Sequence, residues 1–226
     1  KIMSPSAPPL PDDDQIGFTA VCTIFGGPNG SGKSSLFDAL NLPGEFVNAD
    51  AIASRINPKN PESVSLQAGR QVLRRLDELI ATGQSFIYET TLSSHQSIDL
   101  MRRARDAGYE VDLVFVALNS PDLNVERVAD RVARGGHHIP EATVRRRYET
   151  SLSRLAAAIR LSHESLIYDN SGDAPELLLQ LSDDIIEVNN LDETNTFHQR
   201  IAALAGDALD LPSDDVLRAT KPTRHP

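Results

Sequence analysis

Short runs of β-branched and aromatic residues alternate along the chain with longer segments in which apolar residues recur every three or four positions. The short runs predict buried strands, and the longer segments predict amphipathic helices. Strands are expected at residues 18–25, 45–48, 85–88, 111–118, 165–168 and 185–188. Helices are expected at residues 33–40, 62–82, 97–107, 120–134, from 140 onward, and 196–209. This alternation predicts an α/β fold with a parallel sheet that has helices on both faces.

The two ends of the chain have little to bury. Residues 1–15, rich in Pro, Ser and Asp, predict a disordered lead-in, and residues 212–226 predict a flexible tail. Residues 16–211 are then expected to form a single domain. No apolar run approaches the ~20 residues that span a bilayer, and no signal-peptide core is evident. The one cysteine, Cys22, lies in an apolar run. A reducing cytoplasm is therefore the expected location.

Charge is distributed unevenly along the chain. The formal net charge is −10, with 32 acidic and 22 basic residues. Residues 127–160 are the exception, because they hold 8 arginines and 3 acidic residues. A chain this acidic is a poor candidate for general binding to nucleic acid or to an anionic membrane, so neither partner is expected. The basic segment can still form one concentrated anion site.

The residues after the first predicted strand match the phosphate-binding motif G-x-x-x-x-G-K-[ST] at every position. Glycines let the backbone adopt positive φ, and successive N–H groups then converge on a phosphate at the positive end of the next helix. Lys33 is expected to bridge the β- and γ-phosphates of a nucleoside triphosphate, and the Ser34 hydroxyl to bind Mg²⁺. Such turns also occur without a ligand, but the complete match favours a nucleoside triphosphate site. The expected nucleotide-binding residues are Gly27, Pro28, Asn29, Gly30, Ser31, Gly32, Lys33, Ser34 and Ser35.

Missing motifs narrow the class of P-loop protein. The chain has no N-K-x-D motif, which a GTPase normally carries, and no signature loop of a transport ATPase. It also has no apolar run ending in Asp-Glu, as many ATP-hydrolysing motors have. Small kinases instead need a carboxylate on the acceptor side and a mobile lid that brings arginines over the transferred phosphate. The chain offers both.

Two predicted strands lead into carboxylates at the edge of the sheet where ligands bind. Asp50 follows the second strand and could accept a proton from an acceptor hydroxyl or orient Mg²⁺-bound water. Glu89 and Thr90 follow the third strand and could hold the acceptor. The alternatives are an Asp50 that caps the helix beginning at Ala51, a solvated Glu89 and a turn-capping Thr90. The phosphate-binding motif favours the functional interpretation.

Residues 127–150 are the candidate lid. Arg127, Arg131 and Arg134 share one helix face, a Gly-Gly pair breaks that helix, and Arg145-Arg146-Arg147 follow in the next one. Guanidinium groups placed this way neutralise charge on a migrating phosphoryl group. The alternative is a solvated basic helix face. His137 and His138 have no partner at metal-ligand spacing, so a zinc site is not expected.

These motifs together resemble the zeta-toxin family of P-loop kinases. The resemblance is carried by the phosphate loop, Asn48-Ala49-Asp50-Ala51-Ile52, Glu89-Thr90-Thr91-Leu92-Ser93, the Arg131–Pro140 and Arg146–Tyr148 segments, and Tyr168-Asp169-Asn170-Ser171. It spans about residues 18–172 and preserves the order of the motifs.

The resemblance implies an ATP-dependent phosphotransferase that uses Mg²⁺. Well-known zeta toxins phosphorylate the 3′-hydroxyl of the sugar in UDP-N-acetylglucosamine. The roles that follow are phosphate stabilisation by Lys33, a catalytic base at Asp50, and acceptor binding near Glu89 and Thr90. The phosphate-clamping arginines are either Arg131 with Arg146 or Arg134 with Arg147.

Other functions stay open at this point. The acceptor could be another sugar, an antibiotic or a polynucleotide end, although the acidic composition argues against long anionic substrates. A non-catalytic switch module that only binds ATP is a further alternative. Family analogy also implies a possible antitoxin partner that obstructs the nucleotide site.

Overall fold

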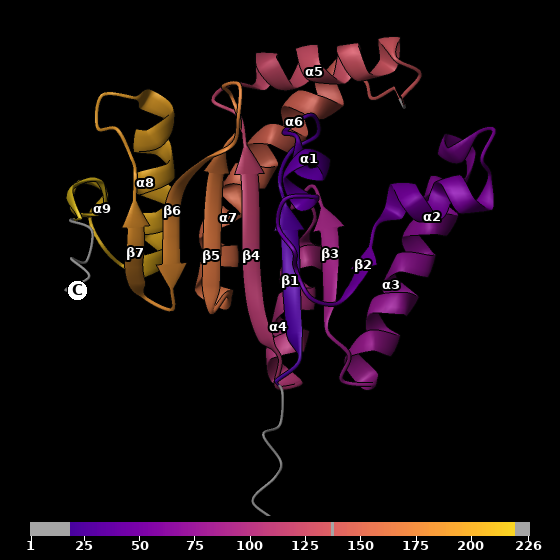
Figure 1. The fold of residues 1–226 in the computed structure, drawn as a ribbon, viewed down its shortest axis with the longest axis horizontal. Coiled ribbons are helices and arrows are strands. Elements are labelled where there is room, and N and C mark those ends of the chain that lie inside the picture. Colours follow the sequence, from indigo (N-terminus) through magenta and orange to yellow (C-terminus); the bar gives the residue numbers. More distant parts are fainter. Residues whose placement is uncertain (1–18, 137, 220–226) are drawn as a thin grey trace, which may run out of the picture.

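A seven-stranded sheet in the order β2-β3-β1-β4-β5-β6-β7 forms the centre of the molecule (Figure 1). The computed structural model describes residues 19–136 and 138–219. Strands β1 to β5 are parallel to one another, whereas β6 and β7 add to the sheet in antiparallel fashion. The strands are β1 Val21–Gly26, β2 Glu45–Val47, β3 Phe86–Thr90, β4 Glu110–Ala117, β5 Glu164–Asp169, β6 Glu176–Ser182 and β7 Ile185–Asn189.

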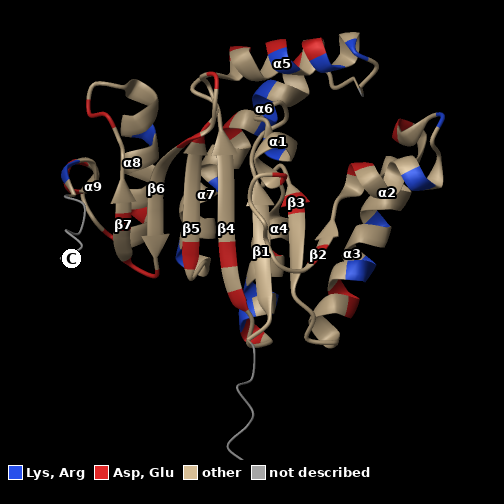
Figure 2. Cartoon of the chain, in the orientation of Figure 1, with Lys and Arg blue, Asp and Glu red and all other residues tan. Residues whose placement is uncertain are grey.

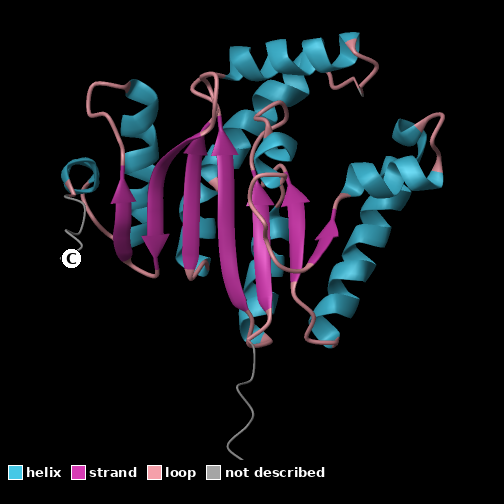
Figure 3. Cartoon of the chain, in the orientation of Figure 1, coloured by secondary structure: helices cyan, strands magenta, loops and turns pink. Residues whose placement is uncertain are grey.

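Helices connect the parallel strands and cover the sheet, as the alternating pattern predicts (Figure 3). Charged residues lie mainly on these helices and at the strand ends (Figure 2). The helices are α1 Lys33–Phe37, α2 Ala49–Ile56, α3 Ser65–Ala81, α4 His95–Asp106, α5 Pro121–Ala133, α6 Glu141–Ser153, α7 Leu155–Leu161, α8 Thr196–Leu209 and α9 Ser213–Arg218, with a 3₁₀ turn η1 at Pro61–Val64. Every helix among the described residues is too short or too polar to cross a bilayer.

The two faces of the sheet bury different cores. Cys22 and Ile24 of β1 point to one face, where α3, α4, α7 and α8 pack over them and their neighbours. Phe25 of β1 points to the other face, against Leu36 of α1. Because β1 and β4 are covered on both sides, they carry near-continuous apolar runs, which is why these strands were predictable from the sequence. The burial of Cys22 confirms its predicted place in a core strand.

Two expectations about the chain's later part are corrected. The parallel sheet is extended by the antiparallel strands β6 and β7, and β6 was not among the predicted strands. The predicted flexible tail contains helix α9, in which Val216 is completely buried. The predicted lead-in and residues 220–226 lie outside the described residues, and the expected single-domain division stays a prediction.

Candidate active site

The phosphate loop lies between β1 and α1, at the upper ends of the parallel strands (Figure 1). Lys33 opens α1 and points back into the loop, where Nζ donates to the carbonyl oxygens of Gly27 (2.8 Å) and Pro28 (3.3 Å). Burial lowers the pKa of Lys33, while the carboxylates of Glu89 and Asp50 act in the opposite direction. A buried cation whose donors rest on carbonyl groups can turn them to phosphate oxygens when an anion binds.

Asp50 lies in the first turn of α2 and is exposed to the cleft beside the phosphate loop. The helix is capped by Asn48 instead, whose Oδ1 accepts from the backbone N–H of Ala51 at 2.8 Å. The Nδ2 of Asn48 donates to Oε2 of Glu89, and Oε1 of Glu89 lies 3.9 Å from Nζ of Lys33. The capping alternative for Asp50 is therefore wrong, because Asn48 provides the cap.

Hydroxyl groups line the side of the cleft next to Glu89. Thr90 ends β3, and its Oγ1 lies 3.0 Å from Oγ of Ser97 and accepts from the N–H of Leu92 at 3.2 Å. Thr91, Ser93 and other polar side chains from the same segment also line the cleft. This wall has carboxylate, amide and hydroxyl groups, which suit the hydroxyl groups of a polar acceptor.

Helices α5 and α6 bring arginines over the opposite side. Figure 2 shows basic residues of these helices above the upper ends of the central strands. Arg131 and Arg134 line the cleft from α5 and its C-terminal end, and the half-buried Arg147 lines it from α6. Nη1 of Arg147 donates to Oδ1 of Asn29 at 3.0 Å. Burial, followed by the nearby charge of Arg146, lowers the pKa of Arg147, and Asp50 opposes this.

Arg146 does not take part in this arrangement. It is exposed on α6 and does not line the cleft. Arg145 is held on the outer surface by Asp122 (2.6 Å) and Glu141 (2.8 Å). The structure thus brings both members of the predicted pair Arg134 and Arg147 into the cleft, but only Arg131 of the pair Arg131 and Arg146. His137 lies outside the described residues.

The cleft between these walls has a volume of about 1150 Å³. It brings together most of the residues singled out from the sequence, although Gly27, Pro28 and Ser31 belong to the loop without lining the cleft. The sequence-predicted residues that line it are Asn29, Gly30, Gly32, Lys33, Ser34, Ser35, Asp50, Glu89, Thr90, Arg131, Arg134 and Arg147.

Further residues line the cleft that sequence reasoning had not assigned to the site. Asn48 and Asn170 are the clearest of them, together with Asp130 of α5. Asn170 belongs to the Tyr168–Ser171 motif, which contributed to the resemblance but had no role. Arg127, which the sequence places on the same helix face as Arg131 and Arg134 in the candidate lid, also lines the cleft.

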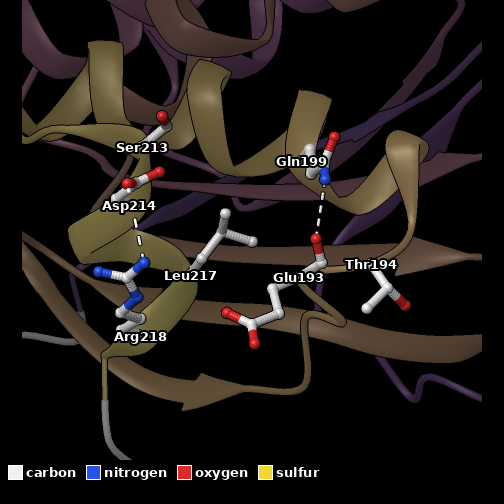
Figure 4. Close-up of a pocket in the computed structure, with 7 residues that line it drawn as sticks. All are labelled: Glu193, Thr194, Gln199, Ser213, Asp214, Leu217 and Arg218. Carbon is white, nitrogen blue, oxygen red and sulfur yellow. Dashed lines mark hydrogen bonds and ion pairs between the residues drawn. The ribbon is translucent and has the colours of Figure 1, made fainter.

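A second, smaller hollow of about 480 Å³ lies between α8 and α9 (Figure 4). Gln199 donates to the carbonyl of Glu193 at 2.8 Å, and Arg218 pairs with Asp214 at 3.9 Å. None of the sequence-predicted site residues lines this hollow. The chemistry of the described residues is therefore concentrated in the larger cleft.

Comparisons with known proteins identify the family of the chain. Residues 18–175 match the family model "Zeta toxin". An uncharacterized protein of Haemophilus influenzae is 36% identical over 129 residues, which are 55% of this chain and 90% of that protein.

Two solved structures share the fold at low identity. A structure from the PezAT chromosomal toxin–antitoxin system of Streptococcus pneumoniae has a TM-score of 0.54 at 15% identity, covering 86% of this chain and 88% of the other. The AvrRxo1-ORF1:-ORF2 complex with ATP has a TM-score of 0.62 at 15% identity, covering 91% of this chain and 77% of the other. With the family model matching well over half of its length, the chain belongs to the zeta toxin family and is an ATP-dependent kinase.

Proposed function

We propose that this kinase transfers the γ-phosphoryl group of ATP to a hydroxyl of a nucleotide sugar such as UDP-N-acetylglucosamine. The observation that carries the proposal is the division of the cleft into two chemically different walls. One wall has the phosphate loop, Lys33 and the arginines of α5 and α6. The other has Asp50, Glu89 and a row of hydroxyl groups. Such a cleft can hold a triphosphate and a hydroxyl acceptor facing each other.

The cationic wall would bind the triphosphate and stabilise the transferred group. The N–H groups of the loop would contact the β-phosphate, and Lys33 would bridge the β- and γ-phosphates. Arg131, Arg134 and Arg147 would neutralise the charge on the γ-phosphoryl group as it moves. Cations placed in this way act most strongly once the cleft excludes water.

Asp50 would act as the base. It lies in the cleft and has no capping role to perform, so its carboxylate is available to an acceptor. The acceptor hydroxyl would pass its proton to Asp50 while the hydroxyl oxygen forms a bond to the γ-phosphorus. The bond from the γ-phosphorus to the bridging oxygen would break, and ADP would leave. Glu89 and Thr90 would hold the acceptor in line.

The donor groups of the cleft also fit Mg²⁺. The Ser34 hydroxyl at the start of α1 and the carboxylates of Asp50 and Glu89 line the same cleft, and oxygen ligands of this kind suit the ion. Ser34 would hold the ion directly. When bound, it would neutralise charge on the β- and γ-phosphates.

An antitoxin is the proposed protein partner. The support is the family and the two-protein systems named for both structural neighbours, PezAT and AvrRxo1-ORF1:-ORF2. A partner that covers the cleft would block nucleotide binding. The cytoplasm stays the expected location, consistent with the buried thiol of Cys22.

The proposal is tested with ATP, Mg²⁺ and a panel of hydroxyl acceptors that includes UDP-N-acetylglucosamine. We expect acceptor-dependent ADP release and a product heavier by one phosphoryl group. Asp50→Ala should bind ATP nearly as the wild type does, yet lose transfer by about 10²-fold or more, as expected for a positioned base. Asp38→Ala, at an exposed aspartate outside the cleft, is the control and should keep full activity.

Two outcomes would contradict the proposal. Full activity of Asp50→Ala would remove Asp50 from the reaction. Tight ATP binding by the wild type with no acceptor-dependent ADP release would support the ATP-binding switch module instead.

A further inference from the structure

Two asparagines from distant parts of the chain reach the phosphate loop. Nδ2 of Asn124, in α5, donates to the carbonyl oxygen of Asn29 at 2.6 Å. Nδ2 of Asn170, which follows β5, donates to the carbonyl oxygen of Ser31 at 2.8 Å. Asn124 is completely buried and Asn170 is 8% exposed. Neither contact is explained by the roles proposed above.

The carbonyl groups that they hold determine where the loop's donors point. In a trans peptide, the C=O of one residue and the N–H of the next point in opposite directions. A carbonyl of Asn29 held against Asn124 therefore turns the N–H of Gly30 away from α5. A carbonyl of Ser31 held against Asn170 likewise turns the N–H of Gly32 away from Asn170. Gly30 and Gly32 both line the cleft.

The two glycines are packed directly against these contacts. Gly30 and Gly32 have φ values of +80° and +87°, which L side chains rarely adopt. A Cβ at Gly30 would lie 2.7 Å from the backbone oxygen of Asn124, and one at Gly32 would lie 2.1 Å from Nδ2 of Asn170. Each asparagine thus meets the loop at the residue whose N–H it orients.

Asn170 is itself fixed from several sides. Its N–H donates to the carbonyl of Ala117 in β4 at 3.0 Å. The carboxylate of Asp169 accepts from the N–H of Ser171 at 2.8 Å, and Oγ of Ser171 accepts from the N–H of Asn119 at 2.7 Å. Nε2 of His198 in α8 lies 3.8 Å from Oδ2 of Asp169. The ends of β4 and β5 and the helix α8 therefore hold this segment in place.

We propose that Asn124 and Asn170 are positioning residues, which hold two carbonyls of the phosphate loop outward and so aim the N–H groups of Gly30 and Gly32 at the phosphates of the bound nucleotide. They act through the loop backbone and transfer no proton. This role rests on the proposed use of the loop for ATP. It also gives a function to the Tyr168–Ser171 motif, in which Asn170 is the contacting residue.

The test measures the affinities of ATP, ADP and AMP by calorimetry for Asn124→Ala, Asn170→Ala and the corresponding leucine variants. Leucine is close in shape to asparagine and adds no charge. We expect each variant to bind ATP and ADP about tenfold more weakly, because misdirected N–H groups lose charge-assisted hydrogen bonds to the β-phosphate. The affinity for AMP, which lacks the β-phosphate, should change less than twofold.

The matched control is Asn189→Ala. Nδ2 of Asn189 donates to the backbone carbonyl of Val216 at 2.7 Å, so this variant loses the same type of bond far from the loop. It should keep the affinities of the wild type for all three nucleotides. The ratio of ATP affinity to AMP affinity separates the proposed role from a general loss of stability. A general loss of stability would lower the thermal unfolding midpoint of the asparagine variants and leave this ratio unchanged.

A second measurement needs no variant. In wild-type protein labelled with ¹⁵N-glycine, the amide resonances of Gly30 and Gly32 should move on addition of ADP and stay in place with AMP. Folded asparagine variants whose affinities for ATP and ADP are within twofold of the wild-type values would overturn the inference. Amide resonances of Gly30 and Gly32 that do not move on addition of ADP would also overturn it. A wild-type protein that binds neither ATP nor ADP would contradict the proposed function instead.

Discussion

Lys33 and Arg147 are cations held in surroundings that disfavour their charge. Burial lowers the pKa of both, and the carboxylate of Asp50 partly offsets the effect in each case. A bound triphosphate would place negative charge next to them and remove this penalty. The carboxylate of Asp50 offsets only part of this penalty. The electrostatics of the cleft therefore favour the binding of a further anion.

Neighbouring arginines on α6 provide a sharp test of this arrangement. Arg147→Ala should lower kcat/KM by about 10²-fold or more, since it removes a charge that faces the transferred group. Arg146→Ala changes the same residue type one position away, on the exposed side of the helix, and should change kcat/KM less than threefold. Steady-state kinetics with ATP and the best acceptor measure both. Equal losses in the two variants would contradict the assignment.

The choice between these arginines could not be made from the spacing of the arginines themselves. Both lie in one run of three, and the rotation of α6 decides which faces the cleft. Val144, Tyr148 and Leu152 are buried at intervals of four residues, and the hydroxyl of Tyr148 donates to the carbonyl of Leu118 at 3.0 Å. Arg147 lies beside this buried face. The apolar spacing was therefore the signal that would have placed Arg147 inward.

Asp112 is a charged residue near the start of β4, next to the strand's long apolar run. Burial, with the charges of Glu110 and Glu164, raises the pKa of Asp112 from 3.8 to about 6, against opposing contributions from a backbone hydrogen bond at Glu164 and from His163. The folded state therefore binds the proton more tightly than the unfolded state does. Stability from this residue falls as pH rises from about 4 to about 6.

Asp112→Asn should remove that pH dependence. At pH 7.5 the free energy of unfolding should rise by on the order of 1 kcal/mol, a value reduced for the partial exposure of the carboxylate. Below pH 4 the wild type and the variant should have nearly equal stability. Urea denaturation at both pH values measures the difference, and Asp173→Asn, at an exposed position, is the control. A variant less stable than the wild type at pH 7.5 would contradict this account.

At the scale of elements, strands with a local signature were predictable and β6 was not. The parallel strands combine β-branched and aromatic residues with a following turn and helix, whereas Leu177-Leu178-Leu179 has no periodicity that separates strand from helix. Its place depends on pairing with β5, which the local sequence does not encode. The turn at Asp183-Asp184, with Asp183 at φ +48°, was the available hint of a hairpin with β7.

Helix α9 is likewise defined by distant contacts. Val216 is fully buried, and Nδ2 of Asn189 donates to the carbonyls of Val216 (2.7 Å) and Ala219 (3.1 Å). Charged neighbours such as Asp214, Asp215 and Arg218 make the segment look like a solvated tail in the sequence. Both contacts join α9 to parts of the fold that its own sequence does not indicate.

Val216→Ala tests this docking. It should lower the free energy of unfolding by about 1–2 kcal/mol, from lost burial and the cavity left behind. Kinase activity should be unchanged, because Val216 does not line the cleft. Leu66→Ala removes an apolar side chain that is 72% exposed and should change stability by less than about 0.5 kcal/mol. A Val216→Ala variant as stable as the wild type in urea would show that α9 is not docked.

At the scale of the whole molecule, the uneven charge of the chain has a structural meaning. The net charge of −10 belongs mainly to the outer surface, and the basic segment folds into α5 and α6 above the cleft. A local cationic wall in an acidic protein favours a compact anion over an extended polyanion. The fold supports this division, since parallel strands bring the phosphate loop, Asp50 and Glu89 to one edge of the sheet.

Transfer of the γ-phosphoryl group within this cleft is tested most directly with ATP labelled with ³²P at the γ-position. In the presence of Mg²⁺ and UDP-N-acetylglucosamine, the wild type should move the label into the sugar nucleotide, and Asp50→Ala should not. Label that stays in ATP, or that appears only as inorganic phosphate with every acceptor offered, would contradict the account.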